Sequence, residues 1–316
     1  MNRSQTTPAL IDVAAAIVRQ ADGRVLLAER PHGKPWVGYW EFPGGKIEAG
    51  EAPLAALARE LHEELGIELD AATPWITFVH AYPEKSVRLH FFRVSRWHGT
   101  AYGREGQRLA WEKPEALMVS PLLPANEKVL RALKLPPLYA ITQASKYGVE
   151  KFMNRLKAAL DGGVRLIQVR EREMSSEELT RFTQRVVELA HPYQACVLVN
   201  GDATVAKRVG ADGVHLQGHQ LMQLDVSPPT GIWAASCHDA RELERAAVLG
   251  ASFVVLSPVL PTASHPGEPG IGWEKFAALI RDYPLPVYAL GGMKPELLDT
   301  AMQHGAHGIA LLSGAW

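Results

Sequence analysis

Two consecutive prolines, Pro136 and Pro137, constrain the fold of this 316-residue chain more than any other feature. Proline fixes φ, lacks an N–H group and disfavours helix in the residue before it. The pair therefore ends the helix expected over 125–133 and forces an extended segment. At roughly 100–200 residues per domain, the length alone predicts about two domains. We expect one domain at 1–135 and a second at 138–316.

The composition is that of an ordinary folded protein and narrows the functional classes. Apolar residues make up 47% of the chain, and 33 Lys and Arg against 34 Asp and Glu give a net charge of −1. This disfavours a disordered chain and a protein that coats nucleic-acid polymers. Only two cysteines, Cys196 and Cys237, favour a reducing compartment. Neither a signal-peptide pattern nor a long apolar run is visible, so we expect a cytoplasmic protein without a membrane partner. The oligomeric state stays open.

The segment before the prolines predicts a mixed α/β domain with one strong helix. Alternating apolar residues indicate strands at 11–19, 24–29, 75–82 and 87–97, and a Gly/Pro-rich stretch occupies 31–45. The helix is expected over 53–65, where Pro53 suits the first turn and Gly66 suits a left-handed C-cap. Its apolar stripe comprises Leu54, Leu57, Leu61 and Leu65.

Three carboxylates lie on the other side of this helix. Glu60, Glu63 and Glu64 are spaced i, i+3 and i+4, so they repel one another. A solvated acidic face is the common explanation of such a cluster, and a hard divalent cation such as Mg²⁺ is the functional one. Gly44 and Gly45, just upstream, allow the backbone to approach a metal or a phosphate.

The complete pattern decides between these alternatives. Residues 45–67 read G-x5-E-x7-R-E-U-x-E-E-x-G-U, with U apolar, and every position is met. This segment resembles the Nudix hydrolase family, which implies an α/β/α fold with a mixed sheet and Mg²⁺-assisted hydrolysis of a nucleoside diphosphate derivative. Mn²⁺ is a possible substitute. The resemblance implies metal ligands and catalytic groups at Glu60, Glu63, Glu64 and the Gly44 carbonyl. Glu60 could instead be the base, and Arg59 would pair with Glu51 or Glu60.

Further matches at 40–48, 96–99, 103–107 and 124–127 resemble the MutT-type 8-oxo-dGTP diphosphatases. That likeness implies that Asn126 reads the purine edge and that Glu105 supplies another catalytic or metal-binding carboxylate. It also implies a set of substrate contacts, namely Arg30, Glu41, Phe42, Pro43, Gly44 and Lys85. Two alternatives stay open from the residues themselves. Asn126 could cap a helix over 127–133, and Phe42 could belong to the core.

After the prolines, eight apolar runs alternate with helical stretches, which predicts a small (β/α)₈ barrel. The expected strands are 138–142, 166–170, 196–200, 213–216, 233–237, 253–258, 287–291 and 308–312. Helices are expected between most of them, for example at 176–189, 240–249 and 295–304. The chain ends soon after the eighth strand, so the last outer helix should be missing. We expect another element, either the first domain or the linker, to cover that gap.

Glycines follow the seventh and eighth strands, where barrels often bind phosphate. The residues are Gly291, Gly292, Ser313 and Gly314. Simple tight turns are the alternative. His238, at the end of the fifth strand, is a candidate general acid or base, and a surface histidine is its alternative.

The second segment resembles the thiamine-phosphate synthase/TenI superfamily. The matching stretches are Gln168–Arg170, Ala211–Leu216, Ser257–Thr262 and Gly291–Gly292. The departures concern charged groups: by this likeness the synthases carry aspartates where Gly201 and Gln220 stand, and lysines where Arg172 and His265 stand. Loss of both carboxylates should prevent Mg-pyrophosphate binding, so we expect no synthase activity.

Three hypotheses follow. The first is hydrolysis of 8-oxo-dGTP to 8-oxo-dGMP and pyrophosphate, a nucleotide-pool sanitation step serving DNA replication and repair, joined to a barrel with reduced chemistry. The second keeps the hydrolase chemistry but directs it at thiamine-related pyrophosphates. In the third, the barrel is a regulatory module that binds a thiamine phosphate.

Overall fold

The computed structural model describes residues 10–228, 231–262 and 269–316, and it divides into two compact units. The first consists of the chain up to Lys134 together with Arg281–Pro284, and the second consists of Leu135–Ile280 and Leu285–Trp316. Each unit has its own buried core, so each is described by itself. Within the described ranges, no helix has both the length and the apolar character needed to cross a membrane.

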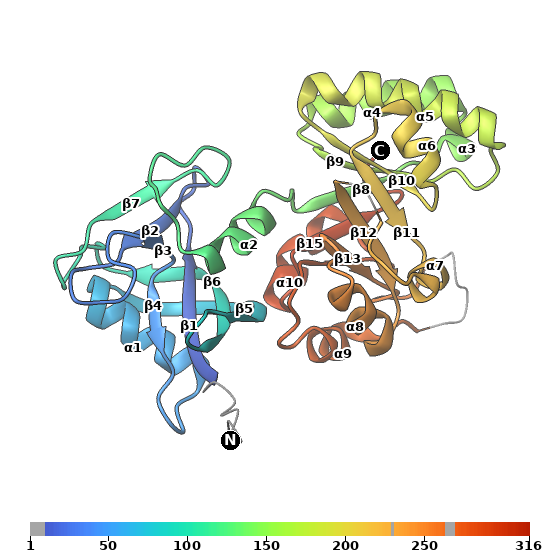
Figure 1. The fold of residues 1–316 in the computed structure, drawn as a ribbon. Helices are drawn as coiled ribbons and strands as arrows, with labels where there is room; N and C mark the ends of the chain where they lie inside the picture. The colour runs from blue at the N-terminus through green and yellow to red at the C-terminus, as the bar shows by residue number, and fades with distance from the viewer. Residues whose placement is uncertain (1–9, 229–230, 263–268) are drawn as a thin grey trace, which may run out of the picture. The chain divides into compact units, whose positions relative to one another are not determined.

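A four-stranded mixed sheet forms the centre of the first unit (Figure 1). Its strand order is β4 (Gly44–Lys46), β1 (Leu10–Val18), β6 (Ser86–His98) and β5 (Glu68–Ala81). β1 runs parallel to β6, whereas the β1–β4 and β5–β6 pairs are antiparallel. The strand expected at 75–82 therefore begins earlier, at Glu68. Bulges in the β5–β6 pairing break the alternation over its first half, which hid this part from the sequence pattern.

A smaller antiparallel sheet completes this unit, in the order β3 (Trp40–Glu41), β2 (Val25–Glu29) and β7 (Leu109–Glu112). β3 and β4 lie in the Gly/Pro-rich stretch, and neither they nor β7 were expected, because strands this short carry little periodic signal. Helix α2 (Pro124–Leu133) follows, with Leu123 at its N-cap. Asn126 lies inside its first turn, so the N-cap interpretation of this residue is wrong.

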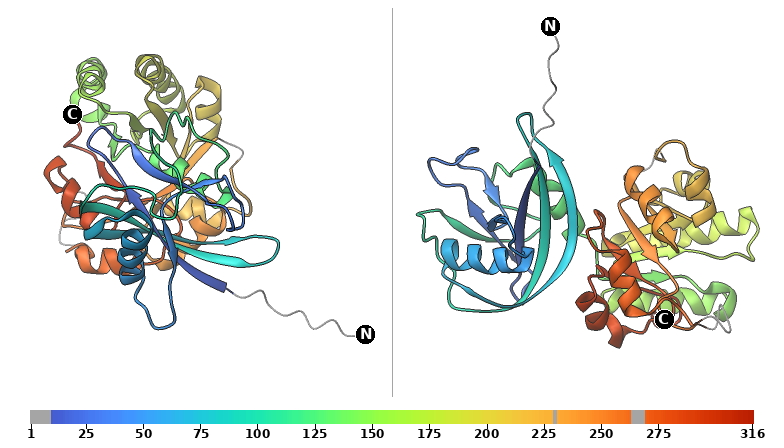
Figure 2. Two further views of the ribbon diagram at one scale, coloured as in Figure 1. Left: turned by 90° about the vertical axis from the view of Figure 1, so that its left-hand side faces the viewer. Right: turned by 90° about the horizontal axis from the view of Figure 1, so that it is seen from below.

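Helix α1 (Pro53–Leu65) has the bounds that the sequence predicts, with Pro53 in the first turn and Gly66 left-handed at φ 67°. Leu57, Leu61 and Leu65 are fully buried. The ribbon of α1 lies against the sheet (Figures 1 and 2). Leu54, assigned to the same stripe, is instead 44% exposed. At the start of the helix Ala56 takes the inward position, and the burial of this one face holds α1 and its carboxylates in place.

The second unit is a closed barrel of eight parallel strands, as the sequence predicts. In chain order the strands are β8 (Leu138–Ile141), β9 (Leu166–Val169), β10 (Cys196–Asn200), β11 (Gly213–Leu216), β12 (Ile232–Cys237), β13 (Phe253–Leu256), β14 (Val287–Ala289) and β15 (Gly308–Leu311). The barrel closes where β15 pairs with β8. Several strands end one or two residues before their expected limits.

Helices lie between the strands on the outside of the barrel (Figures 1 and 2). They are α3 (Ala144–Tyr147), α4 (Val149–Asp161), α5 (Ser176–Ala190), α6 (Ala203–Val209), α7 (Gly218–Gln223), α8 (Ala240–Val248), α9 (Gly272–Leu279) and α10 (Leu298–Gln303). Short 3₁₀ turns occupy His191–Tyr193 and Pro295–Leu297, so the helix expected over 295–304 is in fact divided. Tyr139, Phe253 and Tyr288 fill the barrel interior with edge-on ring contacts.

The described residues contain no helix after β15. The chain instead places Trp316 against Phe152 of α4, with ring centroids 4.8 Å apart. The indole Nε1–H of Trp316 donates to the Ile141 carbonyl at 2.7 Å. Two linker residues also contact the barrel, because the carbonyls of Leu135 and Pro136 accept hydrogen bonds from His307 and Tyr288. The C-terminal residues thus tie β8 to α4 from the far end of the chain.

Candidate active site

Arg59 organises the carboxylates of α1. Its Nε and Nη2 donate to the two oxygens of Glu51, each at 3.0 Å, and its Nη1 donates to Glu60 at 2.8 Å. A further contact of 3.3 Å joins Nη1 to Glu63. The hydrogen bonds that Arg59 donates to Glu51 and Glu60 raise the pKa of Arg59. The sequence left open whether Arg59 pairs with Glu51 or with Glu60, and the structure has both pairs.

Gly45 allows the Glu60 carboxylate to approach the backbone of β4. A Cβ atom built on Gly45 would lie 2.1 Å from Glu60 Cδ, which is closer than any non-bonded contact allows. Gly44, at φ 144°, is equally confined, since its Cβ would meet the Ala14 carbonyl at 2.1 Å. Both glycines are therefore required by the close contact of β4 with its neighbours. The Glu60 side chain is only 15% exposed and is held between Gly45 and Arg59.

Glu64 and Glu105 share a cation that belongs to the chain itself. Lys34 Nζ lies 3.1 Å from Glu64 Oε1 and 2.6 Å from Glu105 Oε2. Burial raises the pKa of Glu64, and Lys34 partly offsets this rise. Gln107, 8% exposed, joins the two elements because its Nε2 donates to the Glu64 carbonyl and its Oε1 accepts the Glu105 N–H. Glu105 is thereby fixed beside the end of α1.

This donor set suits a hard divalent cation. Glu60, Glu63 and Glu64 lie in the C-terminal part of α1, Glu105 is fixed beside the end of the helix, and the Lys34 ammonium group lies between Glu64 and Glu105. Within the described residues, no three acidic, histidine or cysteine side chains converge as a ready set of ligands. The carboxylates instead face Arg59 and Lys34, so a metal would have to replace at least part of these pairs.

Asn126 is the buried polar residue of this unit that has the clearest capacity to bind a ligand. It is 4% exposed, and its Nδ2 has no hydrogen-bond partner among the described residues. A buried donor without a partner costs about 1–3 kcal/mol. Such a cost is explained if a ligand supplies the missing acceptor.

The remaining residues of the expected substrate site lie in three different settings. Arg30 and Glu41 form an ion pair with N–O distances of 2.5 and 2.7 Å, and burial raises the pKa of Glu41 to about 7 despite Arg30. Phe42 and Pro43 are buried, and the Phe42 ring packs edge-on against Phe91 in the core. Lys85 lies in the turn between β5 and β6.

In the barrel, the glycine-bearing segments follow β14 and β15 as expected. Gly291 and Gly292 have φ of 98° and 68°, and Cβ atoms there would meet Pro258 and Leu260 at 2.8 and 2.7 Å. Close packing against the chain after β13 is thus one reason for these glycines. Ser313 and Gly314 are exposed. His238 follows β12 and is 53% exposed, and its Nδ1 contacts Glu242 at 2.8 Å.

A chain of buried polar groups crosses the barrel interior. Gln168 Nε2 donates to Tyr139 Oη at 3.1 Å, Tyr139 contacts His215 Nδ1 at 3.1 Å, and His215 Nε2 contacts Ser236 Oγ at 2.9 Å. Burial lowers the pKa of His215 to about 3, so the imidazole is neutral at physiological pH. Ser236, at the end of β12, is only partly buried.

Neither position where the resemblance led us to look for a metal carboxylate has one, because Gly201 has no side chain and Gln220 has a neutral amide. Gln220 Nε2 donates to the Gly201 carbonyl at 3.0 Å, and Gln217 Nε2 lies 3.4 Å from Asn200 Oδ1. The nearby Asp202 side chain accepts the Val205 N–H at 2.8 Å and caps α6. The amide groups of Asn200, Gln217 and Gln220 find hydrogen-bond partners within this group and at the Gly201 carbonyl. Amides do not suit a magnesium ion, which prefers carboxylate ligands. His265 lies outside the described residues.

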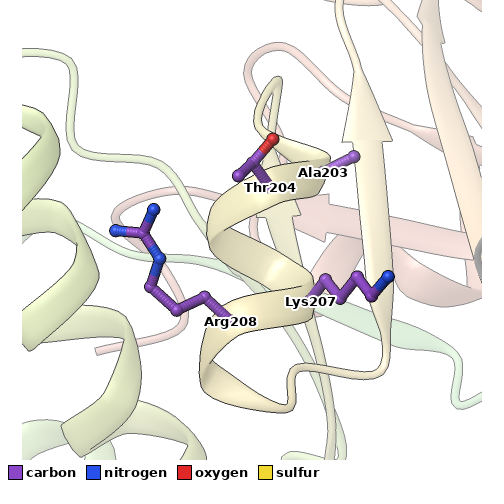
Figure 3. A pocket seen from close by; sticks show the side chains of 4 residues that line it. All are labelled: Ala203, Thr204, Lys207 and Arg208. Carbon is purple, nitrogen blue, oxygen red and sulfur yellow. The ribbon is translucent and has the colours of Figure 1, made fainter.

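A shallow pocket on α6 is lined by Ala203, Thr204, Lys207 and Arg208. The two cationic side chains leave opposite sides of the helix (Figure 3). They do not converge on one point, so this pocket has no arrangement suited to a specific anion.

Two residues of the first site were missed by the sequence analysis, Lys34 and Gln107. Gln107 lies in one of the stretches that resemble MutT-type enzymes, but its role depends on contact with α1, 43 residues earlier. Lys34 lies in the Gly/Pro-rich stretch, and its partners are 30 and 71 residues away. The one local signal for Lys34 is its position between Gly33 and Gly38, two glycines that favour turns.

Comparison with known proteins assigns both units. The family model "NUDIX domain" matches residues 14–132, and "Thiamine monophosphate synthase" matches residues 138–315. An 8-oxo-dGTP diphosphatase of Haemophilus influenzae is 41% identical over 39% of this chain and 91% of its own. A CTP pyrophosphohydrolase of Escherichia coli is likewise 41% identical, over 39% and 90%.

The barrel resembles a protein of Aquifex aeolicus named "Putative thiamine-phosphate synthase 2", with 37% identity over 57% of this chain and 98% of that protein. The two family models match different parts of the chain. The chain therefore belongs to two families, with a Nudix hydrolase domain in residues 14–132 and a thiamine monophosphate synthase/TenI domain in residues 138–315.

Proposed function

We propose that the Nudix domain hydrolyses 8-oxo-dGTP to 8-oxo-dGMP and pyrophosphate. The observation that carries this proposal is the carboxylate cluster of α1, in which Arg59 holds Glu51, Glu60 and Glu63 around one guanidinium. Relatives of this domain include an 8-oxo-dGTP diphosphatase and a CTP pyrophosphohydrolase, and both names imply a nucleotide substrate. Removal of oxidised guanine nucleotides would serve DNA replication and repair in the cytoplasm.

Mg²⁺, or Mn²⁺ in its place, would be held by Glu60, Glu63, Glu64 and the Gly44 carbonyl. When bound, the metal would neutralise phosphate charge and activate a water molecule. Arg59 orients the carboxylates, and Glu105 supplies one more, fixed by Gln107. Glu60 either binds the metal or acts as the base, because closely spaced carboxylates share their titration.

Base recognition belongs to Asn126. Its buried Nδ2 can donate to a carbonyl oxygen of an oxidised guanine, and its Oδ1 can accept an N–H from the same edge. Adenine presents an amino group in place of that carbonyl and would leave the donor without a partner. Arg30 and Glu41, linked as an ion pair, would lie beside the nucleotide, with Phe42 and Pro43 behind them and Lys85 at the edge.

Pyrophosphate release from 8-oxo-dGTP tests this proposal. Glu64→Gln removes one carboxylate charge and should reduce kcat by about 100-fold or more, since metal and water positioning supply most of the rate. Glu150→Gln is the matched control, because Glu150 forms an ion pair with Arg185 on the barrel surface. Equal activity of wild type and Glu64→Gln would contradict the assignment.

For the barrel we propose binding of a thiamine-phosphate-like ligand without synthase activity. The amide contacts of Asn200, Gln217 and Gln220 support the loss of the metal. A phosphate would bind at the exposed Ser313–Gly314 turn and the Gly291–Gly292 turn. His238 is a candidate acid or base for other chemistry there. Calorimetry with thiamine phosphate should show saturable heat. Formation of thiamine phosphate from the two synthase substrates would contradict the proposal.

The fusion itself supports a second candidate for the hydrolase substrate, namely a thiamine-related pyrophosphate. The two activities separate cleanly, because a pyrimidine–thiazole compound offers no purine edge to Asn126. Asn126→Ala should then reduce turnover of 8-oxo-dGTP but leave turnover of thiamine diphosphate unchanged. The oligomeric state does not enter either proposal.

A further inference from the structure

Lys34 occupies a position that neither the expected chemistry nor the family assignment explains. Its ammonium group bridges Glu64 and Glu105, at 3.1 and 2.6 Å. Glu64 belongs to α1 and Glu105 to the loop before β7, so Lys34 joins two elements that meet only in the folded chain. The Glu64 side chain is 15% exposed and the Lys34 side chain 40%, which places the bridge at the border between protein and solvent.

The loop that carries Lys34 is firmly anchored. Arg30 Nε donates to the Pro35 carbonyl at 2.6 Å, and the Gly38 N–H donates to the Arg30 carbonyl at 3.0 Å. Gly33 and Gly38 are left-handed, and so is Trp36, at φ 64°. A bulky side chain in this region of φ is strained, and strained residues are concentrated at functional sites. These contacts fix the loop in a conformation in which the Lys34 side chain reaches Glu64 and Glu105.

The acceptors are fixed as well. Gln107 connects the Glu105 N–H with the Glu64 carbonyl, and the Arg104 N–H donates to the same carbonyl at 3.0 Å. The Lys34 ammonium group lies 3.1 Å from Glu64 Oε1 and 2.6 Å from Glu105 Oε2, so it is placed between two fixed carboxylates.

We propose that Lys34 is an internal counter-cation of the hydrolase site, held by Glu64 and Glu105 until a divalent metal displaces it onto the phosphate chain of the substrate. This inference rests on the proposed function, because it needs Glu64 to be a metal ligand. An ammonium group and a divalent cation repel each other, so one carboxylate oxygen cannot bind both at the same time. The displaced ammonium, still carried by the anchored loop, then meets a phosphate, for which lysine is a common ligand.

Mn²⁺ binding to the nucleotide-free full-length chain tests the first half directly. Titration followed by electron paramagnetic resonance should give a dissociation constant for Lys34→Gln that is roughly two- to fivefold lower than for wild type, the range of a partly exposed ion pair. Lys34→Arg keeps the competing charge and should stay near wild type. Lys157→Gln removes a lysine paired with Asp161 on the barrel surface and serves as the control.

Steady-state kinetics with 8-oxo-dGTP at saturating metal test the second half. Lys34→Gln should raise KM several-fold with a smaller effect on kcat, and Lys34→Arg should recover most of the loss. Metal affinity of Lys34→Gln equal to or weaker than that of wild type would overturn the counter-cation role. An unchanged KM would overturn the transfer to phosphate.

The outcomes also separate this inference from the proposed function. If wild type binds no Mn²⁺ at the hydrolase site, both fail. Suppose instead that wild type binds Mn²⁺ and that Glu64→Gln abolishes activity, but that Lys34→Gln binds Mn²⁺ with the affinity of wild type. In that case only the counter-cation inference fails, and the proposed function stands.

Discussion

At the residue scale, single polar side chains connect distant parts of the chain. Arg59 contacts Glu51, Glu60 and Glu63 at once, and it also donates to the Lys46 carbonyl at 3.0 Å. A planar guanidinium can make this set of contacts, whereas a lysine ammonium is a single point charge. The Nudix pattern predicts these residues, but only the structure shows that one guanidinium serves them all.

Replacement of Arg59 should therefore disable the site without unfolding it. We expect Arg59→Lys to lower kcat/KM for 8-oxo-dGTP by about 10- to 100-fold, because small displacements of reacting groups have effects of this size. Thermal unfolding should change little, since the Arg59 side chain is 27% exposed. Steady-state kinetics together with calorimetry measure both quantities. Activity close to wild type would show that Arg59 does not position the carboxylates.

His215 should make the stability of the barrel depend on pH. Burial lowers the pKa of His215 to about 3 in the folded chain, against about 6.5 in an unfolded chain. The unfolded state then binds the proton more tightly, so stability is complete above pH 6.5 and falls as the pH drops from 6.5 towards 3. The loss at pH 5 should be about 2 kcal/mol relative to pH 7.

Urea unfolding of wild type and His215→Asn at both pH values measures this effect. The asparagine variant should be less stable at pH 7 but less sensitive to pH. An equal decrease of stability in both proteins would assign the pH dependence to other groups.

At the element scale, α1 was predicted well because its ends and its buried face all carry local signals. Pro53, Gly66 and the buried leucines agree, and the bounds are those expected. Strand β7 has only four residues and no such signal. In the first half of β5, bulges interrupt the alternation of apolar and polar residues, so the sequence pattern does not show a strand there. Lys34 and Gln107 could not be predicted for a related reason. Their roles depend on contacts between elements, and a local pattern does not encode these.

Gly45 provides a test of how β4 and α1 fit together. Gly45→Ala would place a methyl group within 2.1 Å of Glu60 Cδ, so the carboxylate has to move. We expect at least a tenfold loss of kcat and a measurable loss of stability. Gly162→Ala is the matched control, because the nearest atoms to a Cβ there lie at 3.4 Å. Wild-type activity of Gly45→Ala would show that Glu60 tolerates displacement.

Helix α5 tests the contribution of capping in the barrel. Ser175 accepts the Glu178 N–H, and the Glu178 side chain accepts the Ser175 N–H at 2.9 Å, which together form a capping box. Ser175→Ala should lower the free energy of unfolding of the barrel by about 1 kcal/mol. Chemical denaturation followed by a barrel-specific probe measures this. A change below about 0.3 kcal/mol would mean that solvent replaces the cap.

At the scale of the whole molecule, each unit has a complete core, and the end of the chain closes the second one. Trp316 packs on Phe152 and donates to the Ile141 carbonyl, so the C-terminal residue joins β8 and α4. Trp316→Ala should lower barrel stability by about 2–4 kcal/mol, the range for loss of a large, mostly packed side chain. Denaturant unfolding checks this, and Trp316→Phe should recover part of the loss. No change in stability would show that the contacts of Trp316 with Phe152 and Ile141 do not stabilise the barrel.

We propose that the Nudix domain of this chain prefers 8-oxo-dGTP, and that its fusion to a thiamine-type barrel does not direct the choice of substrate. The most direct measurement is the kcat/KM of pyrophosphate release, or of phosphate release in the case of thiamine diphosphate, by the full chain with Mg²⁺. The substrates are 8-oxo-dGTP, dGTP, CTP and thiamine diphosphate, each with wild type and with Glu64→Gln. We expect the highest kcat/KM for 8-oxo-dGTP, and we expect Glu64→Gln to lose this activity. A higher value for CTP or thiamine diphosphate would contradict it.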